Sequence, residues 1–185
     1  NYIIGFFFNA EIISIYNAIN VMFKWFYVRI IGMVHTITTY EIARFSKIIK
    51  KIKILNKRID ISAYVFGSIL IIISFTFGKL IFNEWTLYRF ENFDNLKVLI
   101  YLITIEAIFY VLCSNELIYL KAINKIRIVA EINIILESVS LIIIFISLLK
   151  FQNIMIVIQI QIIKNLILLF INKIYKNKQL NLTHN

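Results

Sequence analysis

The chain has 185 residues, of which 61% are hydrophobic, and a formal net charge of +10. Its mean hydropathy is +0.83, and its hydrophobic content exceeds the roughly 45–50% of a soluble domain. This composition predicts a membrane protein and argues against a nucleic-acid-binding module, which needs a basic face on a soluble fold. The single cysteine, Cys113, excludes an internal disulfide and a thiolate metal cluster within the chain.

Apolar segments of about 20 residues, the length of a transmembrane helix, recur along the whole sequence. The predicted complete spans are 12–45, 61–82, 96–120, 128–149 and 154–174, and residues 2–7 resemble the end of a sixth. The fold class is therefore all-α, a polytopic transmembrane helix bundle with about five complete spans. Runs of this length are too long for barrel strands.

The organisation of the chain follows from what lies between these spans. The sequence has no proline, and its connections are polar rather than rich in Gly and Ser, so residues 1–185 are expected to form a single bundle. The first residue is Asn1 rather than a methionine, and no signal-peptide pattern follows it. We therefore expect the chain to be a piece of a longer one.

Residues 44–58 form a strongly basic segment after the first complete span. They include seven lysines and arginines and no acidic residue. We interpret the segment as a cytoplasmic connection, because Lys and Arg are enriched in cytoplasmic loops. Interleaved Ile and Leu residues allow a second interpretation, an amphipathic helix on anionic headgroups. Both interpretations place it on the cytoplasmic side.

The later connections continue the charge alternation. Residues 79–97 balance three basic against three acidic residues and are expected outside, whereas Lys121, Lys125 and Arg127 mark the cytoplasmic side again. The lysines between 173 and 178 place the C-terminus in the cytoplasm. We therefore expect a multi-pass protein of the cytoplasmic (inner) membrane, in contact with membrane lipids.

The first complete span carries a polar stripe. At 100° per residue, its members lie within about 60° of one another; they are Asn17, Asn20, Lys24, His35 and Thr38. A charge at the bilayer centre costs about 2.5–3.5 kcal/mol on insertion scales, so it normally faces a partner or a water-filled cavity. We predict that Lys24 faces a cavity. The alternative is that it pairs with a carboxylate or reaches an interface.

Two other basic side chains of this span have simpler explanations. Arg29 points about 140° away from Lys24 and is expected to pair with a carboxylate or to reach an interface. A lone histidine such as His35 is more often a hydrogen-bonded structural residue than a metal ligand. No metal site and no cofactor is predicted.

The later spans supply acidic and amide side chains. Glu137 shares a face with Asn133 and Ser140, and it is the best acidic candidate for the cavity or for pairing with Lys24. A structural hydrogen bond between helices is an equally good interpretation. Glu106 lies in the preceding span. One face of the last span carries Gln161, Lys164, Asn165 and Asn172.

Enzyme motifs are scarce. The sequence has no Ser-His-Asp arrangement, no paired Asp cluster for a metal and no His pair at i, i+4. With glycine only at positions 5, 32, 67 and 78, a phosphate-binding loop is excluded as well. We therefore expect a protein that is not an enzyme.

Two stretches resemble a family of transporters. "NYIIGFFFNAEIISIYNAI", residues 1–19, resembles the stretch of polysaccharide flippases in which a short "IG-aromatic" helix end and a turn lead into a helix opening with "Y-small-A". "NELIYLKAINKIRIVAEINIILESVSLIIIFISLL", residues 115–149, is similar to their paired helices, joined by a short basic turn at 120–127. The chain thus resembles the C-terminal half of an O-antigen-type flippase of the multidrug/oligosaccharidyl-lipid/polysaccharide exporter superfamily.

This resemblance implies a fold of two six-helix bundles around a central cavity. The chain would form most of the second lobe of a twelve-helix transporter, and the N-terminal half of the same protein would be its partner. Three features depart from the family pattern. The turn "KFQNIMIV" has no glycine, "TITTYEIARF" has no proline, and Asn1 stands where an acid is common.

The implied function is to flip a lipid-linked oligosaccharide, carried on polyprenyl diphosphate, to the outer leaflet for surface polysaccharide synthesis. Coupling to protons or sodium ions is part of this expectation. The implied substrate cavity includes Lys24, Asn17, Asn20, His35 and Glu137. A cationic cavity suits the diphosphate, because fixed positive charges offset its desolvation.

Two other functions fit the same sequence. A drug or cation antiporter of the same superfamily would depend on intramembrane carboxylates such as Glu106 and Glu137. A non-transporting subunit of a membrane complex would have no polar stripe facing a cavity, and it would be bound to other chains.

The charge alternation predicts the orientation of the chain. In a Cys113→Ser background, we expect Lys51→Cys to be shielded from an impermeant thiol reagent in intact cells and Asn92→Cys to be labelled, because the two sites flank the same span. Labelling followed by gel-shift analysis measures both. The reverse pattern would contradict the orientation.

Overall fold

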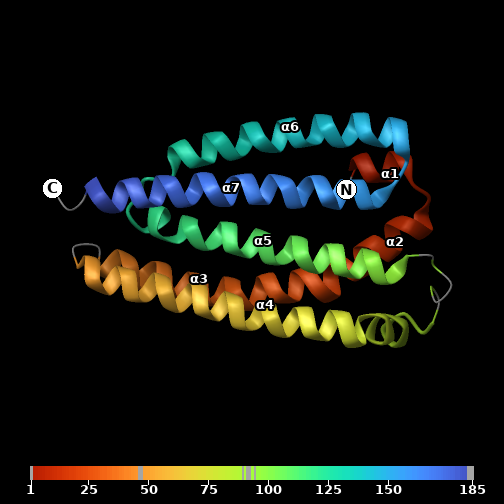
Figure 1. The fold of residues 1–185 in the computed structure, drawn as a ribbon, viewed down its shortest axis with the longest axis horizontal. Helices are drawn as coiled ribbons and strands as arrows, with labels where there is room; N and C mark the ends of the chain where they lie inside the picture. The colour runs from red at the N-terminus through yellow and green to blue at the C-terminus, as the bar shows by residue number, and fades with distance from the viewer. Residues whose placement is uncertain (1, 46–47, 89, 91–92, 94, 183–185) are drawn as a thin grey trace.

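The computed structural model describes residues 2–45, 48–88, 90, 93 and 95–182, which form an elongated bundle of helices (Figure 1). The elements are α1 (Tyr2–Phe7), α2 (Ala10–Ile19), η1 (Asn20–Trp25), α3 (Phe26–Arg44), α4 (Ile49–Trp85), α5 (Leu96–Ala122), α6 (Arg127–Phe151) and α7 (Ile154–Leu182). No strand occurs among these described residues, so the predicted all-α class is confirmed. Asn1, Lys47 and several residues of the predicted outer connection (89, 91–92, 94) lie outside the described part.

Four helices are long and apolar enough to cross a membrane, judged by length and composition. They are Lys50–Trp85, Leu96–Ala122, Arg127–Phe151 and Ile154–Leu180. The sequence predicted five such spans. The remaining one, 12–45, is helical from Ile12 to Arg44. The π-helical turn η1 divides it, and Lys24, Arg29 and His35 lower its hydropathy. It is therefore not among the four.

The basic segment 44–58 differs from both of its predicted forms. Most of it is the beginning of α4, a single helix of 37 residues, rather than a connection or a separate surface helix. Ile52 and Ile59 are buried on its inner face and pack with residues from the ends of α3, α5 and α7, while the described lysines and Arg58 are exposed. At 1.5 Å per residue α4 is about 55 Å long, compared with about 30 Å for a hydrocarbon layer. Its basic turns can therefore extend beyond that layer.

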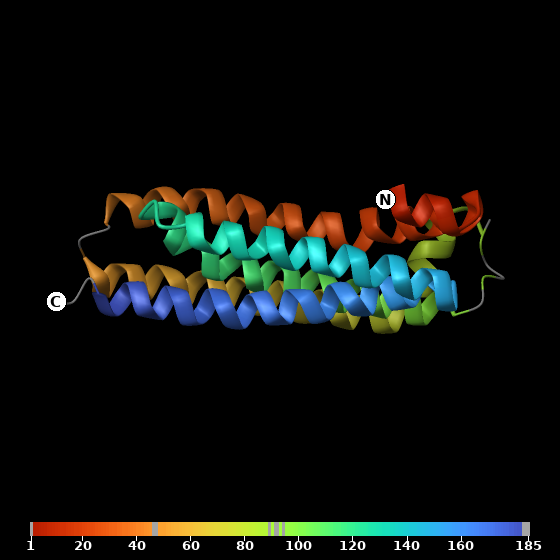
Figure 2. The same ribbon diagram turned by 90° about the horizontal axis from the view of Figure 1, so that it is seen from above.

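The basic segments gather at one end of the bundle. That end contains the end of α3, the start of α4, the turn from α5 to α6 and the end of α7 (Figure 1). The turned view shows α1 and the start of α2 at the opposite end (Figure 2). This arrangement agrees with the expectation that the basic segments share one side, while the orientation in a membrane stays a prediction.

α5 is the central helix of the bundle. It packs against α3, α4, α7 and η1, and buried residues occur on all of its sides. A helix surrounded by others has no need of a polar face, which explains why α5 shows no amphipathic pattern. α6 packs along α7 and makes few contacts with α5, so the bundle is less closely packed on that side.

α2, η1 and α3 follow one another as a single rod, and the π-helical turn η1 changes the direction in which the side chains after it point. Buried positions recur every four residues along it, at Ile15, Ile19, Phe23, Tyr27 and Ile31. In an uninterrupted α-helix each step of four would rotate the buried face by about 40°. A π-helical turn accommodates an extra residue, which reduces this drift and keeps the buried positions facing α5.

The turn between α6 and α7 closes without glycine. Gln152 has a φ of 45°, in the left-handed region that ends many helices, and its N–H bonds to the Leu148 carbonyl at 3.1 Å. The Asn153 side chain accepts a hydrogen bond from Met155 N at 2.9 Å and so caps the start of α7. The chain therefore makes a tight turn at the place where its sequence departs from the flippase pattern.

Close packing of α4 on α5 depends on Gly78. A Cβ atom added there would lie 3.1 Å from Ile100 Cγ2, whereas nothing lies within 4 Å of one added at Gly32. We expect Gly78→Val to destabilise the fold by about 1–3 kcal/mol through overpacking, and Gly32→Val to be close to neutral. Denaturation of the purified protein in detergent, followed by circular dichroism, measures both. An equal effect at the two positions would contradict the close approach.

Candidate functional site

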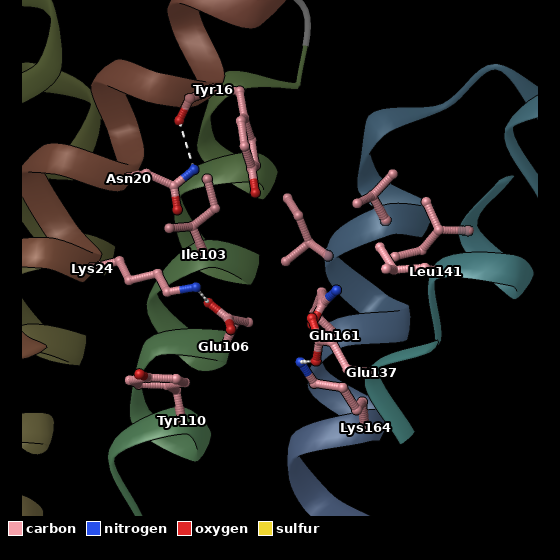
Figure 3. A pocket seen from close by; sticks show the side chains of 13 residues that line it. Tyr16, Asn20, Lys24, Ile103, Glu106, Tyr110, Glu137, Leu141, Gln161 and Lys164 are labelled. Carbon is pink, nitrogen blue, oxygen red and sulfur yellow. Dashed lines mark hydrogen bonds and ion pairs between the residues drawn. The ribbon is translucent and has the colours of Figure 1, made fainter. Parts of the chain in front are cut away.

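A cavity of about 510 Å³ lies between η1, α5, α6 and α7 (Figure 3). It forms where α6 packs along α7 and stands away from α5. Its polar lining consists of Tyr16, Asn20, Lys24, Glu106, Tyr110, Glu137, Gln161 and Lys164. Lys24 and Glu106 lie on one wall, and Glu137 and Lys164 lie across from them (Figure 3). The cavity therefore contains two ion pairs.

The first pair joins η1 to α5. Lys24 Nζ lies 2.6 Å from Glu106 Oε2, and Asn165 of α7 donates a hydrogen bond to Glu106 Oε1 at 3.0 Å. The lysine also lies 5.5 Å from the ring centroid of Tyr110, within the range of a cation–π contact. The side chain of Glu106 is 6% exposed and that of Lys24 is 26% exposed, so the cation is the partner that a solute can reach.

The second pair joins α6 to α7 and has the opposite accessibility. Lys164 Nζ contacts Glu137 Oε2; here the lysine side chain is 13% exposed and the glutamate 46%. The carboxylate is thus the partner that a solute can reach. The formal charges of the two lysines and the two glutamates cancel. The cavity is therefore less cationic than the resemblance to flippases implies.

The partner of Lys24 is Glu106 and not Glu137, the acid that the sequence favoured. The reason is the arrangement of the helices. η1 packs against α5, which carries Glu106, whereas Glu137 lies on α6 and meets Lys164 of the neighbouring α7. The sequence shows Glu106 inside an apolar span, but it does not show which helix packs against that span.

Of the predicted cavity residues, Lys24, Asn20 and Glu137 line the cavity, and Asn17 and His35 do not. Asn17 is exposed. His35 Nε2 lies 2.5 Å from Asn115 Oδ1, and Asn115 donates to Asp60 Oδ1 at 3.3 Å, so the histidine takes part in a polar chain joining α3, α5 and α4. The stripe was drawn at a constant 100° per residue, and η1 breaks that period between Asn17 and Lys24. His35 faces α5 as Lys24 does, but it lies eleven residues further along the rod, about 16 Å at 1.5 Å per residue.

Other contributors to the cavity were not identified from the sequence. Tyr16 lies four residues before Asn20, which lies four residues before Lys24. The π-helical turn places these three residues on one face, and Asn20 donates a hydrogen bond to the Tyr16 carbonyl at 2.8 Å. Tyr110 follows Glu106 by four residues on α5. Such four-residue steps were the available signal, because α-helical residues at i and i+4 share a face.

Arg29 lies away from this cavity. It is exposed and borders a separate hollow with Val21, Trp25 and Phe26. Within the described part of the chain it has no carboxylate partner, so the predicted pairing is not found there.

Further polar contacts link the helices near the basic end. Lys176 Nζ of α7 lies 2.6 Å from Glu116 Oε2 of α5, and both side chains are largely buried. A search of the described residues finds no group of three His, Cys, Asp or Glu side chains that could hold a metal ion.

Comparison of the chain with protein-family models, with curated proteins and with solved structures finds no match. The resemblance to polysaccharide flippases therefore rests on the sequence motifs alone.

The Lys24–Glu106 pair should be energetically coupled. Lys24→Met leaves a buried carboxylate with Asn165 as its remaining donor, and we expect a loss of about 1–3 kcal/mol, less than for a fully buried pair. The double variant Lys24→Met/Glu106→Gln should recover most of this loss, because it removes both charges. Arg127→Met, which breaks an exposed pair with Glu131, is the control and should have no measurable effect. Additive losses in denaturation of the purified protein would contradict the coupling.

Proposed function

We propose that this chain is part of a membrane transporter that flips a lipid-linked oligosaccharide to the outer leaflet of the cytoplasmic membrane. In this proposal it is most of the second lobe of a twelve-helix flippase, and its C-terminus is cytoplasmic. The α2–η1–α3 rod is then the first of its five complete spans. The observation that carries the proposal is a polar cavity with two ion pairs inside a bundle whose outer faces are apolar. The identity of the cargo rests on the sequence resemblance.

The apolar surroundings support a transport role for the cavity. Large side chains such as Ile72 and Phe77 of α4 and Ile142 of α6 are exposed on the outside of the bundle. Polar groups enclosed by such helices in lipid are costly unless they are partnered or line water. A volume of about 510 Å³ is more than two ion pairs need, and it lies in the range of small-molecule sites.

In the first ion pair, an anionic cargo can replace Glu106 as the partner of Lys24. Unit charges 4 Å apart attract by about 4 kcal/mol at an effective dielectric constant of 20, and a diphosphate with more than one negative charge can compete with a single carboxylate for Lys24. Glu106 would still accept the hydrogen bond from Asn165. This hydrogen bond offsets part of the cost when the cation turns from the buried carboxylate to a cargo.

A cation antiporter is the second candidate, and one observation favours it. Glu137 is the accessible member of its pair, with 46% of its side chain exposed. An accessible carboxylate inside a bundle can bind a proton or another cation. In that case Glu137, and not Lys24, would be essential.

Variants of the two pairs separate the candidates. In a flippase-null strain expressing the gene, Lys24→Gln/Glu106→Gln should lower surface polysaccharide by about tenfold or more, equivalent to at least 1.4 kcal/mol, because the accessible cation is lost. Lys24→Arg should retain part of the polysaccharide. Arg29→Gln, which removes an exposed cation of the same rod away from the cavity, is the matched control and should behave like the parent at equal protein abundance.

Export of a cationic dye is measured in the same strains. Full polysaccharide in the Lys24→Gln/Glu106→Gln variant would contradict the flippase. Ion-dependent dye export that persists in this variant and disappears in Glu137→Gln would establish the antiporter in its place.

A further inference from the structure

The polar chain of His35, Asn115 and Asp60 joins the rod to two other helices toward the basic end of the bundle. His35 belongs to α3, Asn115 to α5 and Asp60 to α4, and none of the three lines the first cavity. Asn115 is 2% exposed, whereas His35 and Asp60 are partly exposed. Asp60 directly precedes the predicted span 61–82, so the chain lies close to the end where the exposed basic residues gather.

The hydrogen bonds of this chain fix the position of the proton on the histidine ring. Asn115 donates through its amide nitrogen to Asp60 Oδ1 at 3.3 Å, because an ionised carboxylate can only accept. The other end of the same amide, Oδ1, lies 2.5 Å from His35 Nε2. An amide oxygen is an acceptor, so Nε2 carries the proton. In the neutral ring Nδ1 is then unprotonated and can take up a second proton.

Charged groups on the surrounding helices oppose that second proton. Three cations and one carboxylate act on the chain from α5 and α7, and they outnumber the negative charges of Asp60 and this carboxylate; they are Lys121, Lys173, Lys176 and Glu116. On α4, Lys57 and Arg58 precede Asp60 and are exposed. In η1, which also packs against α3, Lys24 is paired with Glu106. A charged imidazole would therefore enter a partly buried region that is already positive, which is unfavourable.

We propose that His35 is a proton-dependent switch, which docks α3 on α4 and α5 while the ring is neutral and releases it when the ring gains a second proton. Histidine suits this role because its ordinary titration lies between about pH 5 and 8. Docking is complete above this range and is lost as the pH falls through it, since the released ring binds the second proton more readily than the docked ring.

The switch links proton binding to the position of the rod. Because linkage is reciprocal, any ligand that draws the rod away from α5 makes His35 bind its second proton more readily. The inference rests on the polar chain and goes beyond the proposed function. It stands whichever of the candidate functions is correct.

The test measures the distance between the ends of α3 and α4 at two pH values. The full protein, in lipid nanodiscs and in a Cys113→Ser/His184→Gln background, carries spin labels at Tyr40→Cys and Lys53→Cys. Both labelled positions are exposed. The chain has two histidines, so His35 is then the only one. Double electron–electron resonance gives the distance distribution at about pH 8 and about pH 5.5, on either side of the ordinary histidine titration.

We expect a short distance at about pH 8 and a longer one whose population rises about threefold or more at about pH 5.5. A single proton allows a rise of at most about tenfold per pH unit, so the expected change is within its reach. Lys53→Cys with Lys178→Cys is the control pair, because it joins α4 to α7 through two exposed positions. Its distance should be the same at both pH values.

Three further variants identify the group that titrates. His35→Gln keeps an N–H for Asn115 but does not titrate near neutral pH, so the short distance should persist at both pH values. Asp60→Asn keeps an acceptor for Asn115 and should retain the pH dependence, with its midpoint at a lower pH because a carboxylate near the imidazolium is lost. Glu116→Gln/Lys176→Met removes a neighbouring ion pair and should retain the pH dependence as well.

Nuclear magnetic resonance of the nitrogen-15-labelled ring covers the case in which a variant fails to fold. With His35 as the only histidine, the spectrum at about pH 8 should show a neutral ring with its proton on Nε2, and the second proton should appear over the pH range in which the long distance appears. The inference is overturned if the distance does not change with pH, if the change persists in His35→Gln, or if the ring is already doubly protonated at about pH 8.

Discussion

The need to neutralise charge inside an apolar bundle governs the arrangement of these helices. Lys24 lies on a rod that packs against α5, and the carboxylate of Glu106 lies 2.6 Å from its ammonium group. Asn165 of α7 binds the other oxygen of that carboxylate, so a single buried glutamate relates three helices. Removing either charge would leave the other in a low-dielectric setting, where a lone ion is far more costly than a pair.

Apolar packing at the ends of the bundle leaves room for this polar centre. One cluster of buried residues, including Ile19, Leu99 and Val157, lies toward the end that holds α1. Another, including Ile52, Tyr119 and Leu180, lies at the basic end. Between them α6 stays close to α7 and apart from α5, and the resulting space holds two cavities that both have Glu137 and Lys164 in their lining.

The sequence predicted the helices well because long apolar runs without proline allow few alternatives. Three of the predicted spans, beginning at 96, 128 and 154, match α5, α6 and α7 to within a residue at their first positions. The candidate site was less predictable. A constant 100° period cannot reveal a π-helical turn, so Asn17 was wrongly aligned with Lys24. His35 does face α5 as Lys24 does, but the angle alone takes no account of the eleven residues between them along the rod. Residues on different helices are paired by packing, which a single sequence does not contain, and so Glu137 was favoured over Glu106. The basic run continued as helix because Ile52 and Ile59 find buried positions against neighbouring helices.

The separation of the paired charges along the chain affects how the protein is made. Glu106 is synthesised 82 residues after Lys24, so at about 5–20 residues per second Lys24 leaves the ribosome roughly 4–16 s earlier. The α2–η1–α3 rod, which carries Lys24, is not one of the four helices that are long and apolar enough to cross a membrane. A nascent chain entering a bilayer would therefore hold this rod in a polar setting, at the membrane surface or beside the insertion machinery, until α5 emerges. Insertion of the first rod would then be a late and cooperative event, governed by the arrival of its partner rather than by its own hydrophobicity.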